Sequence, residues 1–211
     1  MLLLNQNLQN MLVKLDSSIE KALKKPISKD RKKLLQKVIE YVQEKVDLHQ
    51  SPLLNFICTH NSRRSQFSQI WAQTAASYYS IDAQAYSGGI EITAFNERAI
   101  ASLKRNGFEI DTQGELNPKY RIHFSSKTAP VIAFSKLFDD KINPIKPFAA
   151  IMTCDHADEN CPLIPSSEKR ISLQYEDPKR FDDTHQEAEK YDELSLQIAS
   201  EMFYIFKNIS R

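Results

Sequence analysis

One cysteine of this 211-residue chain lies in a pattern suited to nucleophilic attack on a tetrahedral oxyanion. In NFICTHNSRRSQFSQIWAQ, Cys58 follows a short apolar run, Arg64 stands six positions later, and Ser65 comes next. The run predicts a β-strand over 53–57, and the periodicity after it predicts a helix over 64–79. Cys58 is therefore expected where a strand ends, just before a helix begins.

The turn between the strand and the helix is expected to bind the oxyanion. The first N–H groups of a helix lack intrahelical partners, and the helix dipole is positive there. The same field favours the thiolate of Cys58, the Arg64 guanidinium fits two oxyanion oxygens, and the Ser65 hydroxyl can donate to the sulfur. The predicted oxyanion-binding loop consists of Thr59, His60, Asn61, Ser62, Arg63 and Arg64. Such a site suits displacement at phosphorus or arsenic.

The two remaining cysteines, Cys154 and Cys161, are separated by six residues. Cys154 follows a predicted strand over 148–153, at the same edge of the sheet as Cys58, so the two thiols can approach each other. Unrelated thiols on a loop remain an alternative. Zinc binding with His156 is a further alternative, although the pair lacks the C-x2-C spacing of zinc sites.

The elements that position these residues alternate between strands and helices from residue 52 onwards. The alternation predicts an α/β fold with a parallel sheet covered on both faces. Further strands are expected over 83–87 and 170–175, further helices over 94–106 and 184–208, and a hairpin over 121–125 and 131–135. Residues 51–211 are expected to form the catalytic domain.

Residues 1–50 lack glycine and show helical periodicity, which predicts a helical hairpin extension with helices over 5–25 and 28–47. This extension is expected to pack on the main domain or to serve in self-association. A net charge of +1 argues against nucleic acid as a partner, and no apolar run is long enough to span a membrane. Without a signal peptide, and with three cysteines, the chain is expected to be cytoplasmic, with no metal and no cofactor.

The stretch CTHNSRRSQ resembles the signature loop of the low-molecular-weight protein tyrosine phosphatases and of the arsenate reductases that share their fold. The family pattern C-x-x-N-x-x-R-S is matched by Cys58, Asn61, Arg64 and Ser65. YSGGIEITAFNERAIASLKRNGFEI, residues 86–110, resembles the family's next segment, and the likeness covers roughly 53–209. The resemblance implies a four-stranded parallel sheet flanked by helices, with Asn61 holding a strained loop and Ser87 supporting Asn61.

The resemblance also implies a general acid and a choice of substrate. The family carries its acid in an Asp-Pro pair, which Asp177 and Pro178 match. Thioredoxin-coupled arsenate reductases have C-x6-C followed by proline, as at Cys154 and Cys161. The implied relay starts with attack of Cys58 on arsenate, continues through a Cys58–Cys154 disulfide and ends with Cys161 passing the disulfide to a thioredoxin-type reductant. The alternative is hydrolysis of phosphotyrosine or another phosphomonoester, with Tyr175 as a candidate for ring stacking.

The sequence departs from the family at several positions. Arg63 replaces a common cysteine and adds a positive charge beside the mouth of the loop. His60 replaces a small residue and either tunes the pocket or points to solvent. Gln69 stands where an acidic residue near a potassium site is often found, so no potassium requirement is implied. Residues 112–147 form a longer segment that is expected to cover the pocket, bind a partner or extend the sheet edge.

Overall fold

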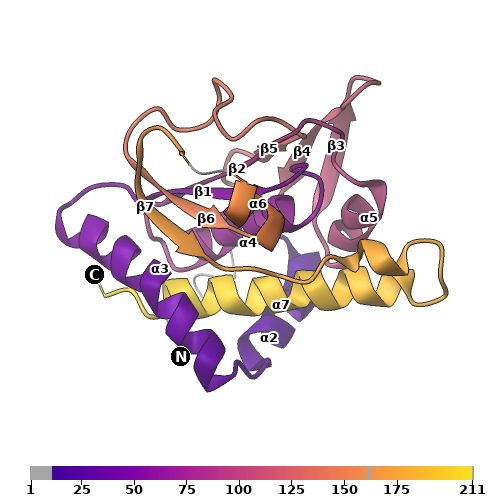
Figure 1. Ribbon diagram of the computed structural model, residues 1–211. Helices are drawn as coiled ribbons and strands as arrows, with labels where there is room; N and C mark the ends of the chain where they lie inside the picture. Colours follow the sequence, from indigo (N-terminus) through magenta and orange to yellow (C-terminus); the bar gives the residue numbers. More distant parts are fainter. Residues whose placement is uncertain (1–10, 161–162, 211) are drawn as a thin grey trace.

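The computed structural model describes residues 11–160 and 163–210 and has a four-stranded sheet at its centre (Figure 1). The strand order is β2-β1-β6-β7, and all three pairings are parallel. This confirms the predicted sheet. The strands are β1 (Leu53–Cys58), β2 (Gln84–Gly89), β6 (Phe148–Met152) and β7 (Ser167–Ser172), the last starting before the predicted 170–175.

Alternate side chains of the central strands enter two separate apolar clusters. In β6, Ala149 and Ile151 belong to the larger cluster, whereas Phe148, Ala150 and Met152 belong to the smaller one, which also contains Cys58. The alternation follows from the two-residue period of a strand, which sends successive side chains to opposite faces. The larger cluster is closed by helices, and the smaller one by Phe138, Ala157 and Ile164. The nucleophile candidate therefore lies toward the more thinly covered face.

The helices α4 (Arg64–Tyr78) and α5 (Glu97–Arg105) follow β1 and β2 in the chain. A long C-terminal helix, α7 (Glu187–Lys207), contacts both of them. Trp71 of α4 is fully buried and donates from its indole nitrogen to Ser195 Oγ of α7 at 2.9 Å. Two short helical segments, α6 (Asp155–Asn160) and η2 (Pro178–Phe181), follow β6 and β7.

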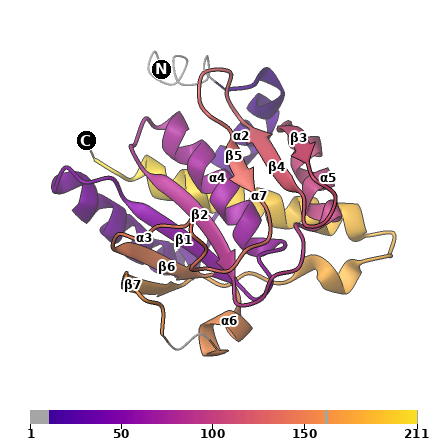
Figure 2. The same cartoon turned by 90° about the horizontal axis from the view of Figure 1, so that it is seen from above.

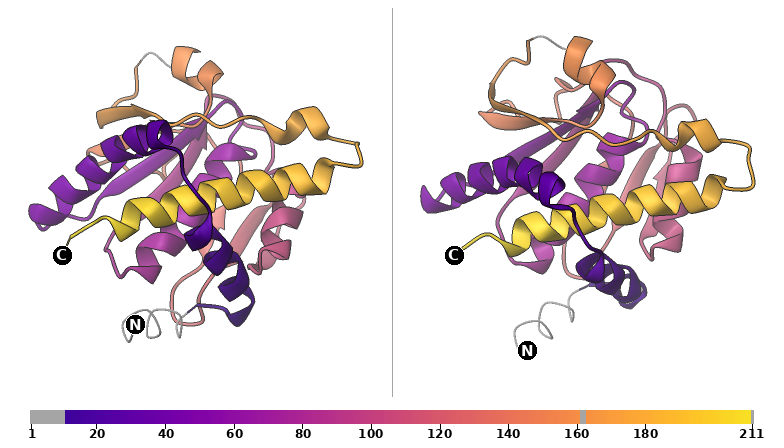
Figure 3. Two further views of the ribbon diagram at one scale, coloured as in Figure 1. Left: turned by 90° about the horizontal axis from the view of Figure 1, so that it is seen from below. Right: turned by 60° about the horizontal axis from the view of Figure 1, so that its bottom comes forward.

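The described part of the N-terminal extension packs onto the same core. It comprises η1 (Val13–Leu15), α2 (Asp16–Lys24) and α3 (Lys29–Asp47), and Ser28 caps α3 by accepting from the Arg31 amide at 3.2 Å. The expected helix over 5–25 begins outside the described residues. Helices α2 and α3 contact α7 from different sides rather than pairing as the expected hairpin (Figure 3). The division of the chain into two domains at residue 50 stays a prediction.

A second, antiparallel sheet has the order β3-β4-β5, with β3 (Glu109–Gln113), β4 (Lys119–His123) and β5 (Val131–Ala133). The predicted hairpin corresponds to the β4–β5 pair, whereas β3 was not predicted. Seen from above, this sheet and α5 lie on the opposite side of the four-stranded sheet from α3 (Figure 2). Within the described ranges, no helix combines the length and apolarity that crossing a membrane requires.

Candidate active site

Cys58 is the last residue of β1, and Arg64 is the first residue of α4. The intervening loop turns back over the end of the sheet, and Cys58 is only 3% exposed. We call residues 58–65 the signature loop. Gly89, at the end of the neighbouring β2, allows the loop to pass closely, because a Cβ there would lie 2.8 Å from both Asn61 N and Thr59 O. The tight loop therefore depends on a glycine outside it.

The Cys58 sulfur lies 3.0 Å from Ser65 Oγ. The Asn61 side-chain amide donates to Ser65 Oγ at 2.8 Å, so the hydroxyl hydrogen of Ser65 is free to point at the sulfur. Asn61, Ser65 and Cys58 thus form a chain of donors that ends on Sγ. This arrangement can stabilise negative charge on the sulfur.

Asn61 adopts a left-handed backbone conformation, with φ of 45°, which is costly for most residues but tolerated by asparagine. Its Oδ1 accepts from the Lys136 backbone amide at 3.1 Å. Its backbone oxygen accepts from Gln66 Nε2 at 2.9 Å. The strained residue is therefore held through both its side chain and its backbone.

Ser87 makes no hydrogen bond to Asn61. Its hydroxyl donates to Gln69 Oε1 at 2.6 Å and lies 3.5 Å from Gln66 Oε1, and Gln66 in turn holds the backbone of Asn61. Ser87 is therefore linked to Asn61 only indirectly, through Gln66. The Asn61 side-chain oxygen instead accepts a hydrogen bond from the backbone amide of Lys136.

The segment after β5 forms the underside of the signature loop. Ser135 Oγ donates to His60 O at 2.8 Å, and Lys136 O accepts from Gly89 N at 2.8 Å. Gly88 permits this approach, since a Cβ there would collide with the Phe138 backbone. The segment within 112–147 that reaches the site thus supports the loop from below. Sequence reasoning missed Ser135, Lys136 and Gln66, and the only signal was that Ser135 ends the predicted strand over 131–135 and Lys136 follows it.

Lys136 is an unusual component of this underside, because it is 1% exposed. Its ammonium lies 3.4 Å from Ser87 Oγ and 5.1 Å from the centre of the Phe134 ring. Burial lowers the pKa of Lys136 to about 8, although the charge of Asp140 opposes the shift. A largely desolvated cation therefore lies behind the loop that is expected to receive an anion.

At the mouth of the loop, Asp177 lies between two arginines. Arg63 donates to its two carboxylate oxygens at 2.9 and 3.2 Å, and Arg64 donates to Oδ2 at 2.8 Å. Burial by itself raises the pKa of the Asp177 carboxyl, but the hydrogen bond from Arg63 and the charge of Arg64 outweigh burial and hold the pKa below its ordinary value. Asp177 is thus an anion in this arrangement.

The Arg64 guanidinium is directed at the acid loop, by which we mean residues 174–183. Besides its contact with Asp177, it donates to the backbone oxygen of Tyr175 at 3.2 Å. An incoming oxyanion would have to compete with Asp177 for this guanidinium. The other carboxylates of the loop have their own partners: Glu176 pairs with Arg180, Asp182 accepts from Tyr191, and Asp183 pairs with Arg98.

Cys154 lies in the same apolar cluster as Cys58, and both are free thiols. Cys154 is fully buried, with its sulfur 3.5 Å from Thr59 Oγ1 and 3.4 Å from the donating amide of Ala157. Thr59 follows Cys58 directly, so the contact ties Cys154 to the signature loop. Cys161 lies outside the described residues.

Two further side chains of the signature loop bond to residues outside it, and His156 approaches the loop from α6. His60 Nε2 lies 3.1 Å from Glu91 Oε2, so this histidine pairs at the surface. Ser62 Oγ donates to Ala94 O at 2.7 Å. The ring of His156 lies 3.3 Å from Thr59 Oγ1. The roles of all these residues in a reaction stay predictions.

Tyr175 is buried rather than displayed beside the mouth. It is 5% exposed, its hydroxyl donates to Glu201 Oε2 at 2.8 Å, and the Arg31 guanidinium lies 4.6 Å above its ring centre. Its ring therefore packs in the interior in this arrangement and offers no surface for a substrate ring.

No protein-family model matches the sequence. Arsenate reductase 1 of Staphylococcus saprophyticus is 35% identical over 124 residues, and arsenate reductase 2 of Staphylococcus epidermidis is 31% identical over 123. Each alignment covers 58% of this chain and 76% of the relative.

The fold has a counterpart in a low-molecular-weight protein tyrosine phosphatase from T. tengcongensis, with a TM-score of 0.52 and 15% identity. That alignment covers 75% of this chain and 100% of the other. At this identity the likeness shows the fold alone. It agrees with the parallel sheet and flanking helices described above.

Proposed function

Since the chain belongs to the family of arsenate reductases and low-molecular-weight protein tyrosine phosphatases, we propose that this enzyme reduces arsenate to arsenite through a relay of cysteines. The observation that carries the proposal is the burial of a second free thiol, Cys154, in the same cluster as Cys58. A phosphatase needs the nucleophile, the arginine and the acid, but it has no use for this second thiol. The names of the relatives point to the same reaction.

In the first step the Cys58 thiolate attacks arsenate, an S–As bond forms and one As–O bond breaks. Asp177 protonates the departing oxygen, which leaves as water. Arrival of the oxyanion draws Arg64 away from Asp177, and both the loss of this cation and the new negative charge raise the pKa of the carboxyl. The pairing of Asp177 with Arg64 supports this exchange, since the guanidinium can accept either anion.

In the second step the Cys154 sulfur attacks Sγ of Cys58. The S–As bond breaks, its electron pair stays on arsenic, and arsenite leaves as a Cys58–Cys154 disulfide forms. Cys161 then attacks Cys154 and frees Cys58, and an external dithiol of the thioredoxin type reduces the resulting Cys154–Cys161 disulfide. Helix α6, DHADEN, buries only Ala157, so opening it to join these two cysteines costs little apolar contact. A reducing, cytoplasmic compartment suits this chemistry.

The test is arsenate-dependent oxidation of NADPH with thioredoxin and thioredoxin reductase. Wild type is expected to turn over, and Cys154→Ser is expected to lose this activity. Hydrolysis of 4-nitrophenyl phosphate is measured in parallel, because it needs Cys58 but not Cys154. Cys58→Ser, the matched control, should abolish both reactions. Turnover of the phosphate ester by wild type without any arsenate-dependent oxidation would refute the reductase.

Phosphomonoester hydrolysis remains the second candidate, and the chain from Asn61 through Ser65 to Cys58 favours it equally. A phosphotyrosine substrate is less well supported, because the Tyr175 ring is buried and cannot stack on a substrate ring. Self-association through residues 1–50 also stays a prediction, which sedimentation velocity of the full chain would test.

A further inference from the structure

Within the described part of the N-terminal extension, Arg31 of α3 reaches the acid loop. Arg31 Nε and one terminal nitrogen each donate to a carboxylate oxygen of Glu201 at 2.8 Å. The other terminal nitrogen donates to the backbone oxygen of Gln174 at 3.0 Å. The extension therefore contacts the chain three residues before Asp177.

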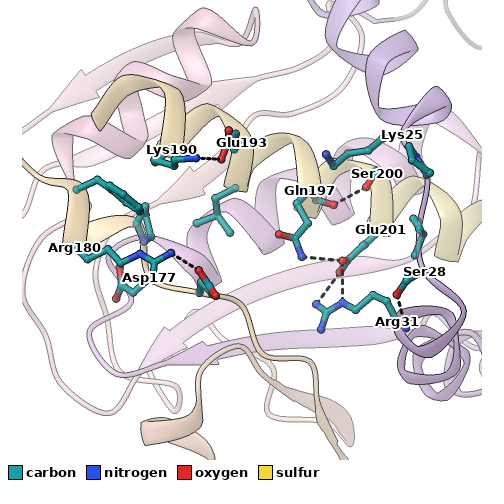
Figure 4. Close-up of a pocket in the computed structure, with 16 residues that line it drawn as sticks. Lys25, Ser28, Arg31, Asp177, Arg180, Lys190, Glu193, Gln197, Ser200 and Glu201 are labelled. Atoms are coloured by element: carbon teal, nitrogen blue, oxygen red, sulfur yellow. Dashed lines mark hydrogen bonds and ion pairs between the residues drawn. The ribbon is translucent and has the colours of Figure 1, made fainter. Parts of the chain in front are cut away.

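Glu201 joins the extension, the acid loop and α7 into one buried cluster. It is 2% exposed and also accepts from the Tyr175 hydroxyl at 2.8 Å. The Arg31 guanidinium lies over the Tyr175 ring. Figure 4 shows Arg31 and Glu201 along the pocket that also contains Asp177, a cavity of about 640 Å³. A two-pronged pairing of arginine with a buried carboxylate fixes direction as well as distance.

The start of the acid loop is thus held from two sides. At the rear, Arg31 binds Gln174 and covers Tyr175, while at the front Arg64 binds the Tyr175 backbone and Asp177. These front contacts belong to the guanidinium that a substrate oxyanion would claim, whereas the Arg63 side chain holds only the carboxylate of Asp177 and not the start of the loop. The rear contacts do not touch the oxyanion site, so they persist when the front ones are exchanged.

We infer that Arg31 is a positioning residue, which keeps the acid loop in place through Gln174, Tyr175 and Glu201 when the oxyanion takes Arg64. The inference rests on the proposed role of Asp177 as the acid. It also gives α3 a part in the catalytic unit, because Arg31 belongs to α3. The contribution of Arg31 is greatest in the complex with the oxyanion and smallest in the free enzyme.

A second cluster of a cation, a carboxylate and a tyrosine, also involving α3, provides a matched control. Lys45 of α3 pairs with Glu168 of β7 at 2.8 Å, and the Tyr41 hydroxyl donates to the same carboxylate at 2.8 Å. This cluster has the same composition of cation, carboxylate and tyrosine, but it contacts no residue of the acid loop. The double variant Lys45→Gln/Glu168→Gln therefore weakens the docking of α3 without touching the loop.

The test is hydrogen–deuterium exchange of peptides covering 173–181 in the full chain, with and without saturating inorganic phosphate. Arg31→Gln/Glu201→Gln removes both charges together, so no lone buried charge is left. With phosphate bound, the peptides of the acid loop are expected to exchange roughly ten times faster in this variant than in wild type. The control double variant should behave as wild type. Equal exchange in all three proteins with phosphate bound would overturn the inference.

Kinetics then separate this inference from the proposed function. In the arsenate-dependent assay, Arg31→Gln/Glu201→Gln should lower kcat roughly tenfold with KM changed less than about twofold, since misplacing the acid affects the chemical step. Arg31→Lys keeps a charge opposite Glu201 but lacks the second prong, and it should recover part of the loop protection. If the loop exchange responds as expected but wild type shows no arsenate turnover, the positioning role of Arg31 is established and the reductase is refuted. A fall in kcat equal to that of the control variant would instead show a merely structural role.

Discussion

The mouth and the underside of the signature loop are built from different interactions. At the mouth, the partly exposed side chains of Arg63 and Arg64 both pair with the carboxylate of Asp177. On the underside, the side chains of Asn61, Ser87 and Lys136 are almost completely buried and are joined mainly by hydrogen bonds of neutral amides and hydroxyls.

The difference reflects what each side has to do when a substrate binds. A carboxylate and a tetrahedral oxyanion can replace each other on an arginine, so the contacts at the mouth are exchangeable. The underside holds Asn61 at a φ of 45°, which requires contacts that do not change during the reaction. Variants on the two sides should therefore differ in their main effect: those at the mouth chiefly alter rates and add a pH-dependent change in stability, and those beneath the loop chiefly alter stability.

The largest effect is expected for Asp177→Asn, which removes the proposed general acid from the mouth. The value of kcat should fall by roughly 10²–10⁴, because the leaving oxygen no longer receives a proton. Inhibition by inorganic phosphate should become stronger at the same time, because Arg63 and Arg64 lose their competing anion. Initial rates with and without phosphate measure both effects, and weaker inhibition would contradict the exchange at the mouth.

The same variant tests the charge pairing through pH. The pKa of Asp177 is depressed in the folded protein, so its ion pairs stabilise the fold above the ordinary carboxyl value of 3.8 and are lost as the pH falls through the folded value. The difference in unfolding free energy between wild type and Asp177→Asn should therefore shrink as the pH falls from 7 to 3. Urea denaturation across this range measures it, and a constant difference would argue against the pairing.

On the underside, Lys136→Met should stabilise the protein by an amount on the order of 3 kcal/mol at pH 7, because the folded state disfavours the charged lysine. The pKa of Lys136 falls from 10.5 to about 8, so between these values the unfolded chain binds more protons and the stability of wild type should rise with pH. The variant should lack this rise. Urea denaturation at pH 7 and pH 10 is the measurement, with Lys141→Met as an exposed control.

Asn61→Ala is expected to lower the free energy of unfolding by about 2 kcal/mol, since two side-chain hydrogen bonds are lost. Asn61→Gly loses the same bonds but accepts the left-handed backbone, so it should be less destabilised than the alanine variant by roughly 1 kcal/mol. Urea denaturation of both proteins separates the two contributions. Equal losses would show that the backbone conformation is not strained.

The smallest effect is expected for Arg63→Gln, because Arg64 still pairs with Asp177. The pKa of Asp177 should move up toward its ordinary value, so the protonated acid should persist to higher pH and kcat on the alkaline side should rise by roughly two- to fivefold. A pH profile of kcat measures this. A lower alkaline kcat would contradict the role given to Arg63.

The sequence predicted most of the catalytic end of the fold. The strands β1 and β6 were recognisable as apolar runs, and parallel strands bring their carboxyl ends to one edge, which is why Cys58 and Cys154 could be expected near each other. Strand β3 escaped prediction because EIDTQ is exposed or half-buried throughout and shows no apolar alternation. The edge strand β7 was misplaced for a similar reason, as only Ile171 is fully buried in it.

By itself the sequence determined the signature loop around the Cys58 sulfur, because Asn61 and Ser65 contact each other and the sulfur within a few residues and their spacing fixes those contacts. Only the tertiary structure decided what supports that loop and what holds the acid loop. Lys136 meets Asn61 across 75 residues, and Arg31 meets Gln174 across 143. Such contacts depend on how strands and helices pack, and neither residue type nor local spacing records that packing.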